Sequence, residues 1–343
     1  METELIREIK KMQVNIPSIR LRRLRQHPIL RDLVRETQLN LKDLVLPLFI
    51  KGVKGEKQPV LTMPGHHQIP LNRLEEEIEE LLSLKITSVI LFGVPPHKDE
   101  VGSDSYHDEG IIQQAIRKIK AITSDILIIS DSCFCEYTSH GHCGFLNERS
   151  GRVDIDNDMT LDLLVKQALS HAKAGADVIA PSGMIDGMVG AIRRGLDSAG
   201  FEHIPILSYS VKYNSCLYGP FRAATEGAPN FGDRSTHMMD PANGNEALRE
   251  ALLDVEEGAD MLMVKPAHTY LDIIYRLKQA YPYIPLGAYH PSGEFMMIKA
   301  AAEKGLVNEK KAAIEVMTAI RRAGADFIIS YFTKEAAQQK WFS

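Results

Sequence analysis

Short apolar runs alternate with longer amphipathic segments along most of this chain. The runs are rich in Val, Ile and Leu, and most are followed by a segment whose apolar positions recur every three to four residues. Runs of the first kind predict strands buried on both faces, and the segments between them predict amphipathic helices. Eight runs of this kind occur, at residues 43–50, 88–93, 125–131, 177–183, 205–210, 260–265, 285–290 and 326–331.

The repeated order of strand and helix predicts an α/β protein whose eight parallel strands close into a (β/α)8, or TIM, barrel. An open doubly wound sheet usually has fewer strands and a glycine-rich nucleotide turn after its first strand, and no such turn follows the first run here. Three predicted helices end in AGAD, EGAD and AGAD directly before a strand. This recurrence indicates a repeated helix-to-strand turn in which glycine supplies a left-handed cap.

The segment before the first predicted strand has a different character. It contains the arginine-rich stretch IRLRRLRQHPILRDLVRE, in which apolar positions recur irregularly. We expect residues 1–40 to form an N-terminal extended arm that contacts a neighbouring subunit or is simply solvated, and residues 41–343 to form the catalytic barrel. The basic run is short and is followed by acidic residues, which disfavours nucleic acid as its partner.

Composition narrows the class of partner. The chain has 343 residues, 44% of them hydrophobic, and a formal net charge of −5, so it can bury a large core and favours a small-molecule substrate over a polyanion. No apolar stretch approaches the roughly 20 residues that span a bilayer, and Met1 opens the charged segment METELIREIKK. We therefore expect a cytoplasmic protein without a membrane partner. Four cysteines, three of them in one short loop, suit a reducing compartment and a metal site.

Two lysines occur where predicted strands end. The longest insertions follow the third and fifth strands, at residues 131–160 and 211–245, which is the catalytic face of a barrel. Lys265 closes the run MLMVK, and Lys212 follows the adjacent strand. One such lysine alone would most simply be a side chain that reaches solvent. Two converging amines, partly desolvated, would lower each other's pKa, and a neutral amine attacks a ketone or aldehyde to form a Schiff base.

The loop DSCFCEYTSHGHCG contains Cys133, Cys135 and Cys143, with His140 and His142 beside them. Three thiolates suit zinc, and three protein ligands leave a fourth position open for water or substrate. Two alternatives remain: a closed zinc site completed by one histidine, and three thiols without a metal. The position of the loop on the same face as the lysines favours the open, catalytic site.

Arg222 and Arg234 lie in the glycine-containing stretch from GPFR to FGDR, which is long and polar enough to form a mobile lid. The planar fork of arginine matches a carboxylate. The loop therefore suggests an acidic small-molecule substrate.

Taken together, these motifs resemble those of a known family, porphobilinogen synthase, also called 5-aminolevulinate dehydratase. The similar stretches run from about residue 18 to residue 333 and so cover nearly the whole chain. They are RLRRLRQHPILRDLVRET, LVLPLFI, DSCFCEYTSHGHCG, SYSVKYNSCLYGPFR, FGDR, DPANGNEALRE, GADMLMVKP, SGE and IISYF.

The resemblance implies a (β/α)8 barrel with an N-terminal arm, assembled as a homo-octamer of arm-hugging dimers. It implies condensation of two 5-aminolevulinate molecules into porphobilinogen with loss of two waters, an early step of tetrapyrrole and heme synthesis. It also implies zinc, because this chain has the cysteine version of the metal loop. The family's allosteric magnesium ion is expected in many bacterial members, and the sequence assigns no residues to it here.

The resemblance gives each motif a role. Lys212 and Lys265 are expected to form Schiff bases with substrate, and the three cysteines to bind zinc. The remaining matches concern the substrate groups: Arg222 and Arg234 for the carboxylate of one substrate, Ser292 and Tyr331 for that of the other, and Asp131 and Ser182 near the reacting groups.

Several pocket positions depart from the family pattern. Gly183 follows Ser182 where Asp is usual, Met188 replaces an arginine, and Phe295 replaces a tyrosine. Residues 266–269 read PAHT against a usual PGMP or similar. Met238 replaces a glutamine and cannot donate the amide hydrogen bond, so we expect weaker binding of the second substrate's carboxylate.

Two other functions remain open. A lysine aldolase acting on another keto acid would need only one Schiff base, so the second lysine disfavours it. A catalytically weakened barrel retained as a zinc-binding oligomer is suggested by the clustered departures, but such a protein would have no reason to keep both lysines and all three thiols.

Overall fold

The structure is a computed structural model that describes residues 19–149 and 151–342. It consists of two compact units, Met1–Gln38 and Leu39–Ser343. The opening segment METELIREIKK of the predicted arm lies outside the described residues.

The described part of the first unit holds two short helices, η2 (Leu21–Arg25) and α2 (Pro28–Leu33). Proline at the first position of α2 fits a helix start, and the His27 side chain accepts a hydrogen bond from the Ile29 N–H as the cap. Neither helix buries a residue. The exposed apolar side chains of this unit are Ile19, Leu21, Leu24, Ile29, Leu33 and Val34.

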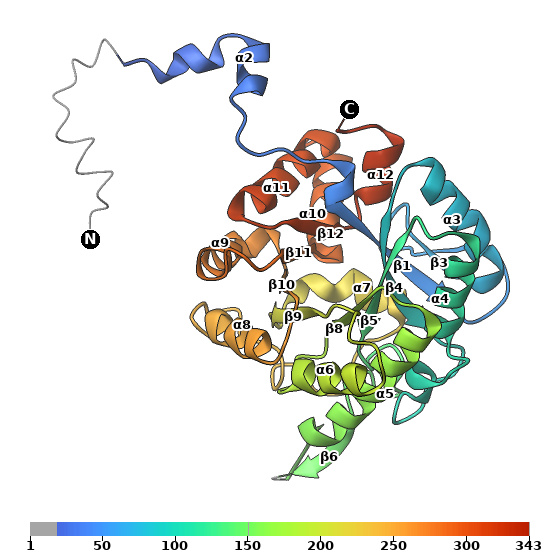
Figure 1. Ribbon diagram of the computed structural model, residues 1–343. Helices are drawn as coiled ribbons and strands as arrows, with labels where there is room; N and C mark the ends of the chain where they lie inside the picture. Colours follow the sequence, from blue (N-terminus) through green and yellow to red (C-terminus); the bar gives the residue numbers. More distant parts are fainter. Residues whose placement is uncertain (1–18, 150, 343) are drawn as a thin grey trace. The chain divides into compact units, whose positions relative to one another are not determined.

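Eight parallel strands form the centre of the second unit, so the predicted (β/α)8 barrel is confirmed in the described chain (Figure 1). Each strand coincides with one of the eight apolar runs. The strands are β1 (Leu44–Lys51), β4 (Ser88–Val94), β5 (Leu127–Ser132), β8 (Val178–Pro181), β9 (Leu207–Lys212), β10 (Met261–Lys265), β11 (Leu286–His290) and β12 (Phe327–Ser330).

Neighbouring strands follow the order β8-β5-β4-β1-β12-β11-β10-β9. The two end strands meet through a single parallel bridge between Ile179 and Ile206, where the Ile179 N–H donates to the Pro205 carbonyl at 3.1 Å. This contact nearly closes the barrel, so the carboxyl ends of all eight strands face one end.

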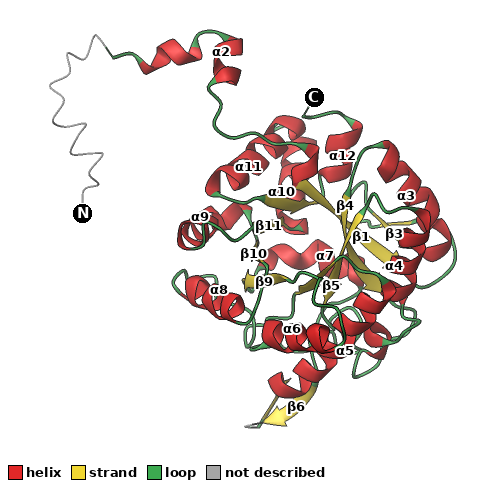
Figure 2. Ribbon diagram, viewed as in Figure 1, coloured by secondary structure: helices red, strands yellow, loops and turns green. Residues whose placement is uncertain are grey.

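Helices surround the strands as an outer ring (Figure 2). Their apolar faces pack against the barrel because the periodic apolar positions lie along one side of each helix. The helices of the ring and of the loops are α3 (Leu74–Ser83), α4 (Ile111–Ile122), α5 (Asn157–Ala174), α6 (Met188–Ser198), α7 (Gly219–Thr225), α8 (Glu246–Glu256), α9 (Leu271–Ala280), α10 (Ser292–Glu303), α11 (Glu309–Ala323) and α12 (Thr333–Gln338).

The three GAD turns have the predicted left-handed glycine. The φ angles are 103° at Gly175, 101° at Gly258 and 122° at Gly324. The aspartate that follows has a second role, because its carboxylate accepts a hydrogen bond from the backbone N–H of a neighbouring strand. The pairs are Asp177 with Ile128 at 2.7 Å, Asp260 with Ile206 at 2.8 Å and Asp326 with Leu286 at 2.8 Å.

The two long insertions lie at the carboxyl end of the strands, as predicted. The first contains the antiparallel hairpin of β6 (Leu146–Arg149) and β7 (Arg152–Ile155), and the second contains the 3-10 helix η6 (Cys216–Tyr218) and α7. Within residues 19–149 and 151–342, no helix has both the length and the apolar character needed to cross a membrane.

Candidate active site

Two lysines end neighbouring strands. Lys212 is the last residue of β9 and Lys265 is the last residue of β10, and the two are register partners across the strand pair. The strand predicted at 205–210 extends to 212, so Lys212 is the last residue of its strand rather than a residue beyond it. Both side chains are buried, each residue being 5% exposed. The barrel thus brings together two amines that are far apart in sequence.

The Lys265 amine lies in an aromatic box. Burial, and next the charge of Lys212, lower the pKa of Lys265 from its ordinary value to about 7. A substantial fraction of this amine is therefore neutral and nucleophilic near neutral pH. The distances from Nζ to ring centroids are 3.9 Å for Tyr289, 5.0 Å for Phe221, 5.2 Å for Tyr218 and 5.4 Å for Tyr209.

The Lys212 amine has more polar surroundings. It donates a hydrogen bond to the carbonyl oxygen of Ser182, and its Nζ lies 5.7 Å from the centroid of the Tyr209 ring. The Ser182 hydroxyl donates to Asp131 Oδ2 at 3.0 Å. Burial, and then the neighbouring Glu136, raise the pKa of Asp131 to about 7 even though both lysines oppose the shift. Asp131 and Ser182 therefore join the same cluster as Lys212.

A small cavity of about 10 Å³ lies between these groups. That volume is close to what a single water molecule needs. Any larger ligand therefore requires lining residues to move, and these include Phe221 of α7 in the predicted lid. The polar and thiol side chains that line the cavity are Asp131, Cys135, Glu136, Ser182, Lys212, Tyr218, Arg234 and Lys265.

Three other predicted residues lie near this cavity without being among its lining residues: Arg222, Ser292 and Tyr331. The Ser292 hydroxyl, at the first position of α10, accepts a hydrogen bond from the Phe221 N–H at 2.9 Å. The Tyr331 hydroxyl lies 3.1 Å from that of Tyr289, whose ring faces the Lys265 amine. Ser292 and Tyr331 are thus grouped on the Lys265 side.

The three predicted metal ligands converge. The Sγ atoms of Cys133, Cys135 and Cys143 all lie within 4.8 Å of one another, and all three residues are buried. Tetrahedral zinc with bonds of about 2.3 Å separates its sulfur ligands by roughly 3.8 Å, so this cluster fits the ion with small adjustments. Thiolates are also the donor type that zinc prefers.

The two histidines of the loop make other contacts. His140 Nε2 donates to the Glu100 carbonyl at 3.0 Å, and its Nδ1 accepts from the His142 N–H at 3.1 Å. His142 Nε2 donates to the Phe231 carbonyl at 3.1 Å. The group that could hold a metal in the described chain comprises the three cysteines alone. This arrangement favours a site with an open fourth position over one completed by histidine.

Arg234 links the cysteine loop to other residues of the predicted lid, the stretch from GPFR to FGDR. Its Nη2 donates to the carbonyls of Gly141 at 2.8 Å and Gly227 at 2.7 Å, and the residue is 3% exposed. Its Nε and the Nε of Arg222 are buried and have no hydrogen-bond partner among the described residues. Burial, and then the charge of Arg234, lower the pKa of Arg222. Two adjacent guanidinium groups with unsatisfied N–H donors suit a bound anion.

Further bonds connect the same two segments. The Asn230 N–H donates to the His140 carbonyl at 3.0 Å, and its side-chain amide donates to the Ser139 carbonyl at 2.7 Å. The rings of His142 and Phe231 lie 4.5 Å apart. The predicted mobile lid is therefore bound to the metal loop at several points.

Some residues of the site were not singled out from the sequence. Glu136 is 2% exposed and lines the cavity, and its Oε2 has no hydrogen-bond partner within the described part of the chain. Glu136 could have been predicted as a site residue, because it directly follows Cys135 in the sequence. Tyr209 and Tyr289 could not, because aromatic residues in apolar runs are normal core residues.

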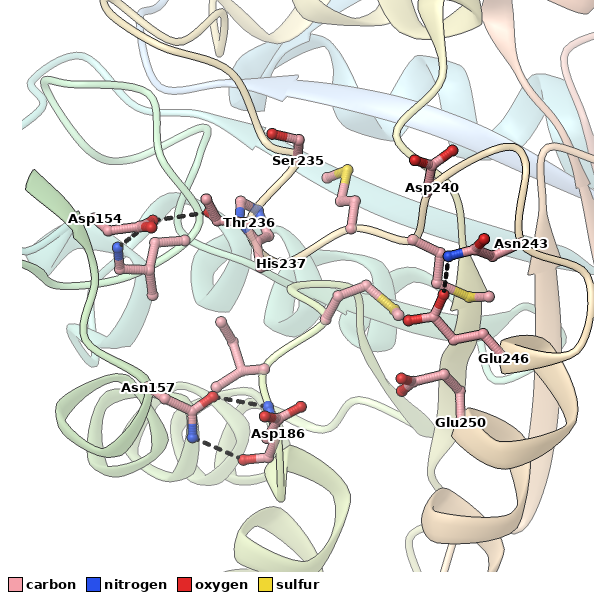
Figure 3. A pocket seen from close by; sticks show the side chains of 15 residues that line it. Asp154, Asn157, Asp186, Ser235, Thr236, His237, Asp240, Asn243, Glu246 and Glu250 are labelled. Atoms are coloured by element: carbon pink, nitrogen blue, oxygen red, sulfur yellow. Dashed lines mark hydrogen bonds between the residues drawn. The ribbon is translucent and has the colours of Figure 1, made fainter. Parts of the chain in front are cut away.

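A wider pocket has a volume of about 570 Å³, and Figure 3 shows the side chains that line it. Met184 and Met238 line it, and they also pack with the three cysteines in one cluster. Among the described residues, no lysine lines the pocket, and its acidic side chains are Asp154, Asp186, Asp240, Glu246 and Glu250. Met238 therefore contacts both this polar pocket and the cysteine cluster.

A barrel that brings two buried lysine amines together beside three thiols has the arrangement of an enzyme that acts on carbonyl compounds through lysine. Residues 18–339 match the family described as Delta-aminolevulinic acid dehydratase. The chain belongs to this family.

Named relatives agree with this assignment. The Delta-aminolevulinic acid dehydratase of Halalkalibacterium halodurans is 53% identical over 319 residues, which cover 93% of this chain and 96% of the relative. That of Synechocystis is 50% identical over 322 residues, covering 94% and 98%. The crystal structure of delta-aminolevulinic acid dehydratase (porphobilinogen synthase) from Toxoplasma gondii, in complex with the reaction product porphobilinogen, aligns with a TM-score of 0.90 and 42% identity over 94% of this chain and 91% of that one.

Proposed function

We propose that this chain is a porphobilinogen synthase that condenses two 5-aminolevulinate molecules with loss of two waters. The observation that carries the proposal is the pair of buried amines, Lys212 and Lys265, which end neighbouring strands at the catalytic end of the barrel. Each substrate has a ketone, and two amines can activate two ketones. Membership of the family supports the same reaction.

Lys265 is the nucleophile whose lowered pKa provides a neutral amine near pH 7. Its nitrogen attacks the ketone carbon, the carbonyl oxygen leaves as water, and the resulting iminium withdraws electrons from the adjacent carbon. Lys212 binds the second ketone in the same way. Asp131 and Ser182, bonded to each other near Lys212, are suited to exchange protons with the reacting groups.

Zinc is the metal we propose for Cys133, Cys135 and Cys143, because three convergent thiols match its ligand preference. When bound, zinc supplies a Lewis acid that polarises or holds an oxygen or nitrogen ligand near the second substrate. The residues of the chain hold the ion, exclude water and orient the substrates. The allosteric magnesium ion stays a prediction without assigned residues.

The substrate carboxylates are assigned to two groups of side chains. Arg222 and Arg234 have unsatisfied N–H donors that suit one carboxylate. For the other we propose Ser292 and Tyr331, on the side of Lys265. Ser292 accepts a bond from the lid through its oxygen, so its hydroxyl hydrogen can still be donated to a carboxylate.

We propose that the arm is an oligomer contact and that the assembly is the homo-octamer implied by the family resemblance. The exposed apolar residues of η2 and α2 support a role in contact with another subunit. We also propose a cytoplasmic location, since the four cysteines are free.

The test is a turnover assay of the purified chain with 5-aminolevulinate, with and without a zinc chelator. We expect porphobilinogen to form, its rate to fall after chelation, and zinc but not magnesium to restore the rate after metal removal. If zinc-loaded protein forms no porphobilinogen, the two remaining functions are the lysine aldolase and the catalytically weakened barrel. The aldolase would react with another keto acid, and the weakened barrel would not.

A further inference from the structure

The motif Ser292-Gly293-Glu294 opens α10, and its three residues contact three different segments. Ser292 accepts the hydrogen bond from Phe221 in the lid. A Cβ on Gly293 would lie 2.5 Å from the Leu217 carbonyl oxygen, so the backbone of η6 packs directly on this glycine. The third residue, Glu294, has no part in the chemistry described above, although it is completely buried.

The Glu294 carboxylate binds the turn that follows Lys265. Its Oε2 accepts a hydrogen bond from the Ala267 N–H at 3.3 Å. Its Oε1 accepts from the Thr269 N–H at 3.1 Å and from the Thr269 hydroxyl at 3.3 Å. Two residues of the four in turn 266–269 are thus held by one side chain from another element.

Thr269 is one of the positions at which this chain departs from the family pattern. A proline at 269, the residue usual there, would have neither an N–H nor a hydroxyl to donate. Of the two bonds to Glu294 Oε1, one therefore requires a residue other than proline at 269 and the other requires a hydroxyl there. These hydrogen bonds offset the free-energy cost of burying the Glu294 carboxylate.

The position of this turn matters because it fixes the end of β10. The Lys265 amine lines the cavity and is surrounded by four aromatic rings. The backbone carbonyl of Lys265 accepts hydrogen bonds from the Tyr213 N–H at 3.0 Å and the Tyr218 hydroxyl at 3.1 Å. A nucleophile displaced by about 1 Å loses roughly 100-fold in rate. A turn that is loose after residue 265 would produce such a displacement.

We propose that Glu294 is a positioning residue that holds the turn after Lys265 and so aligns the Lys265 amine for attack on the substrate ketone. The identity of the ketone in this inference rests on the proposed function. The alignment of the Lys265 amine does not, because it can be measured without substrate.

The experiment compares Glu294→Gln with Glu303→Gln, an equivalent change at an exposed position at the end of the same helix. The amide keeps the size of the side chain but replaces one accepting oxygen by a donor that faces N–H groups. We measure kcat and KM with 5-aminolevulinate, borohydride trapping at Lys265 and Lys212 by peptide mapping, and acetylation of both lysines by acetic anhydride without substrate.

We expect Glu294→Gln to lower kcat by about 10- to 100-fold, with a smaller change in KM. Trapping and acetylation should change at Lys265 and not at Lys212, and Glu303→Gln should match the parent protein. Thr269→Val, which removes only the hydroxyl, should show the same pattern with a smaller effect, and it decides the matter if Glu294→Gln does not fold.

The proposal is overturned if Lys265 reacts equally fast in the parent, Glu294→Gln and Thr269→Val, or if both lysines are affected alike. A parent protein that traps no substrate refutes the proposed function instead. The acetylation ratio of Lys265 to Lys212 still decides the role of Glu294 in that case.

Discussion

At the residue scale, the site depends on two buried amines that end neighbouring strands. Lys265 is surrounded by four aromatic rings, whereas Lys212 donates to the Ser182 carbonyl. Burial is the first cause of the low pKa of Lys265, and the charge of Lys212 is the second. The charge of Lys212 therefore favours the neutral, reactive form of the Lys265 amine.

This coupling predicts the pH dependence of Schiff-base formation. Below pH 7 the Lys265 amine is mostly protonated, so its trapping rate should rise about tenfold per pH unit and level off above pH 7, the value of its pKa. Lys212→Met removes the neighbouring charge, so the midpoint at Lys265 should move to higher pH. Borohydride trapping at a series of pH values measures both midpoints. A midpoint near that of an ordinary lysine in the parent protein would contradict the assignment.

A second residue-scale prediction concerns Met238. Replacement by Gln supplies an amide donor for the substrate carboxylate, so we expect KM to fall by about tenfold, the value of one hydrogen bond to a charged group. Met239→Gln is the matched control, because Met239 lines the same wide pocket but lies outside the cysteine cluster. Steady-state kinetics gives the result, and an unchanged KM in Met238→Gln would refute this role.

The sequence reveals residues whose type conflicts with their surroundings. Lys265 ends an apolar run and three cysteines occur in one short loop, so both features were predictable from the order of residue types alone. Glu294 was not, because its partners Ala267 and Thr269 are remote in sequence and a glutamate near a helix start is ordinary. Its burial follows only from the packing of α10 on the turn.

At the element scale, the GAD turns set the direction from helix to strand. Gly175→Ala should cost about 1–2 kcal/mol of unfolding free energy, the strain of a left-handed alanine, because a Cβ there meets no atom closer than 3.5 Å. Gly324→Ala should cost more, since its Cβ would lie 2.7 Å from the Lys278 Cβ.

Urea unfolding compares these variants with Gly219→Ala, where φ is −52° and a Cβ meets no described atom within 4 Å. We expect Gly219→Ala to leave the unfolding free energy nearly unchanged. Equal effects for all three changes would argue against a special requirement for glycine in the turns.

The contact between the cysteine loop and the lid gives another element-scale prediction. A Cβ on Gly141 would lie 2.1 Å from the Ala228 carbonyl oxygen, and φ is +72°. Gly141→Ala should therefore separate the segments, raise KM and weaken zinc binding. Gly232→Ala, with φ +57° and open space, adds strain without a collision. Zinc affinity by chelator competition distinguishes them, and equal affinities would refute the coupling of loop and lid.

Elements were predictable where the apolar pattern was regular. All eight barrel strands coincide with the apolar runs. The pair β2 (Gln58–Pro59) and β3 (His67–Pro70) and the hairpin β6–β7 were missed. These strands are short, and neither β2 nor β7 has a buried residue, so their periodicity carries little information.

At the scale of the whole molecule, the arm exposes apolar side chains, whereas the barrel buries most of its own. Ile29 is 70% and Leu33 is 79% exposed on α2, whereas the barrel has its own extensive core. If the arm is an oligomer contact, Ile29→Glu combined with Leu33→Glu should reduce the mass of the assembly. Arg31→Glu on the same helix is the charge control. Light scattering gives the mass, and circular dichroism should show the barrel unchanged. An unchanged mass would contradict the role of the arm.

The proposed reaction requires that two lysines of one cavity each form a Schiff base with 5-aminolevulinate. Borohydride reduction of the zinc-loaded protein with this substrate, followed by peptide mapping, tests this requirement. We expect adducts on Lys265 and Lys212, with the Lys265 adduct absent from Lys265→Met. A map with adducts on neither lysine, or only on lysines outside the cavity, would contradict the proposed reaction.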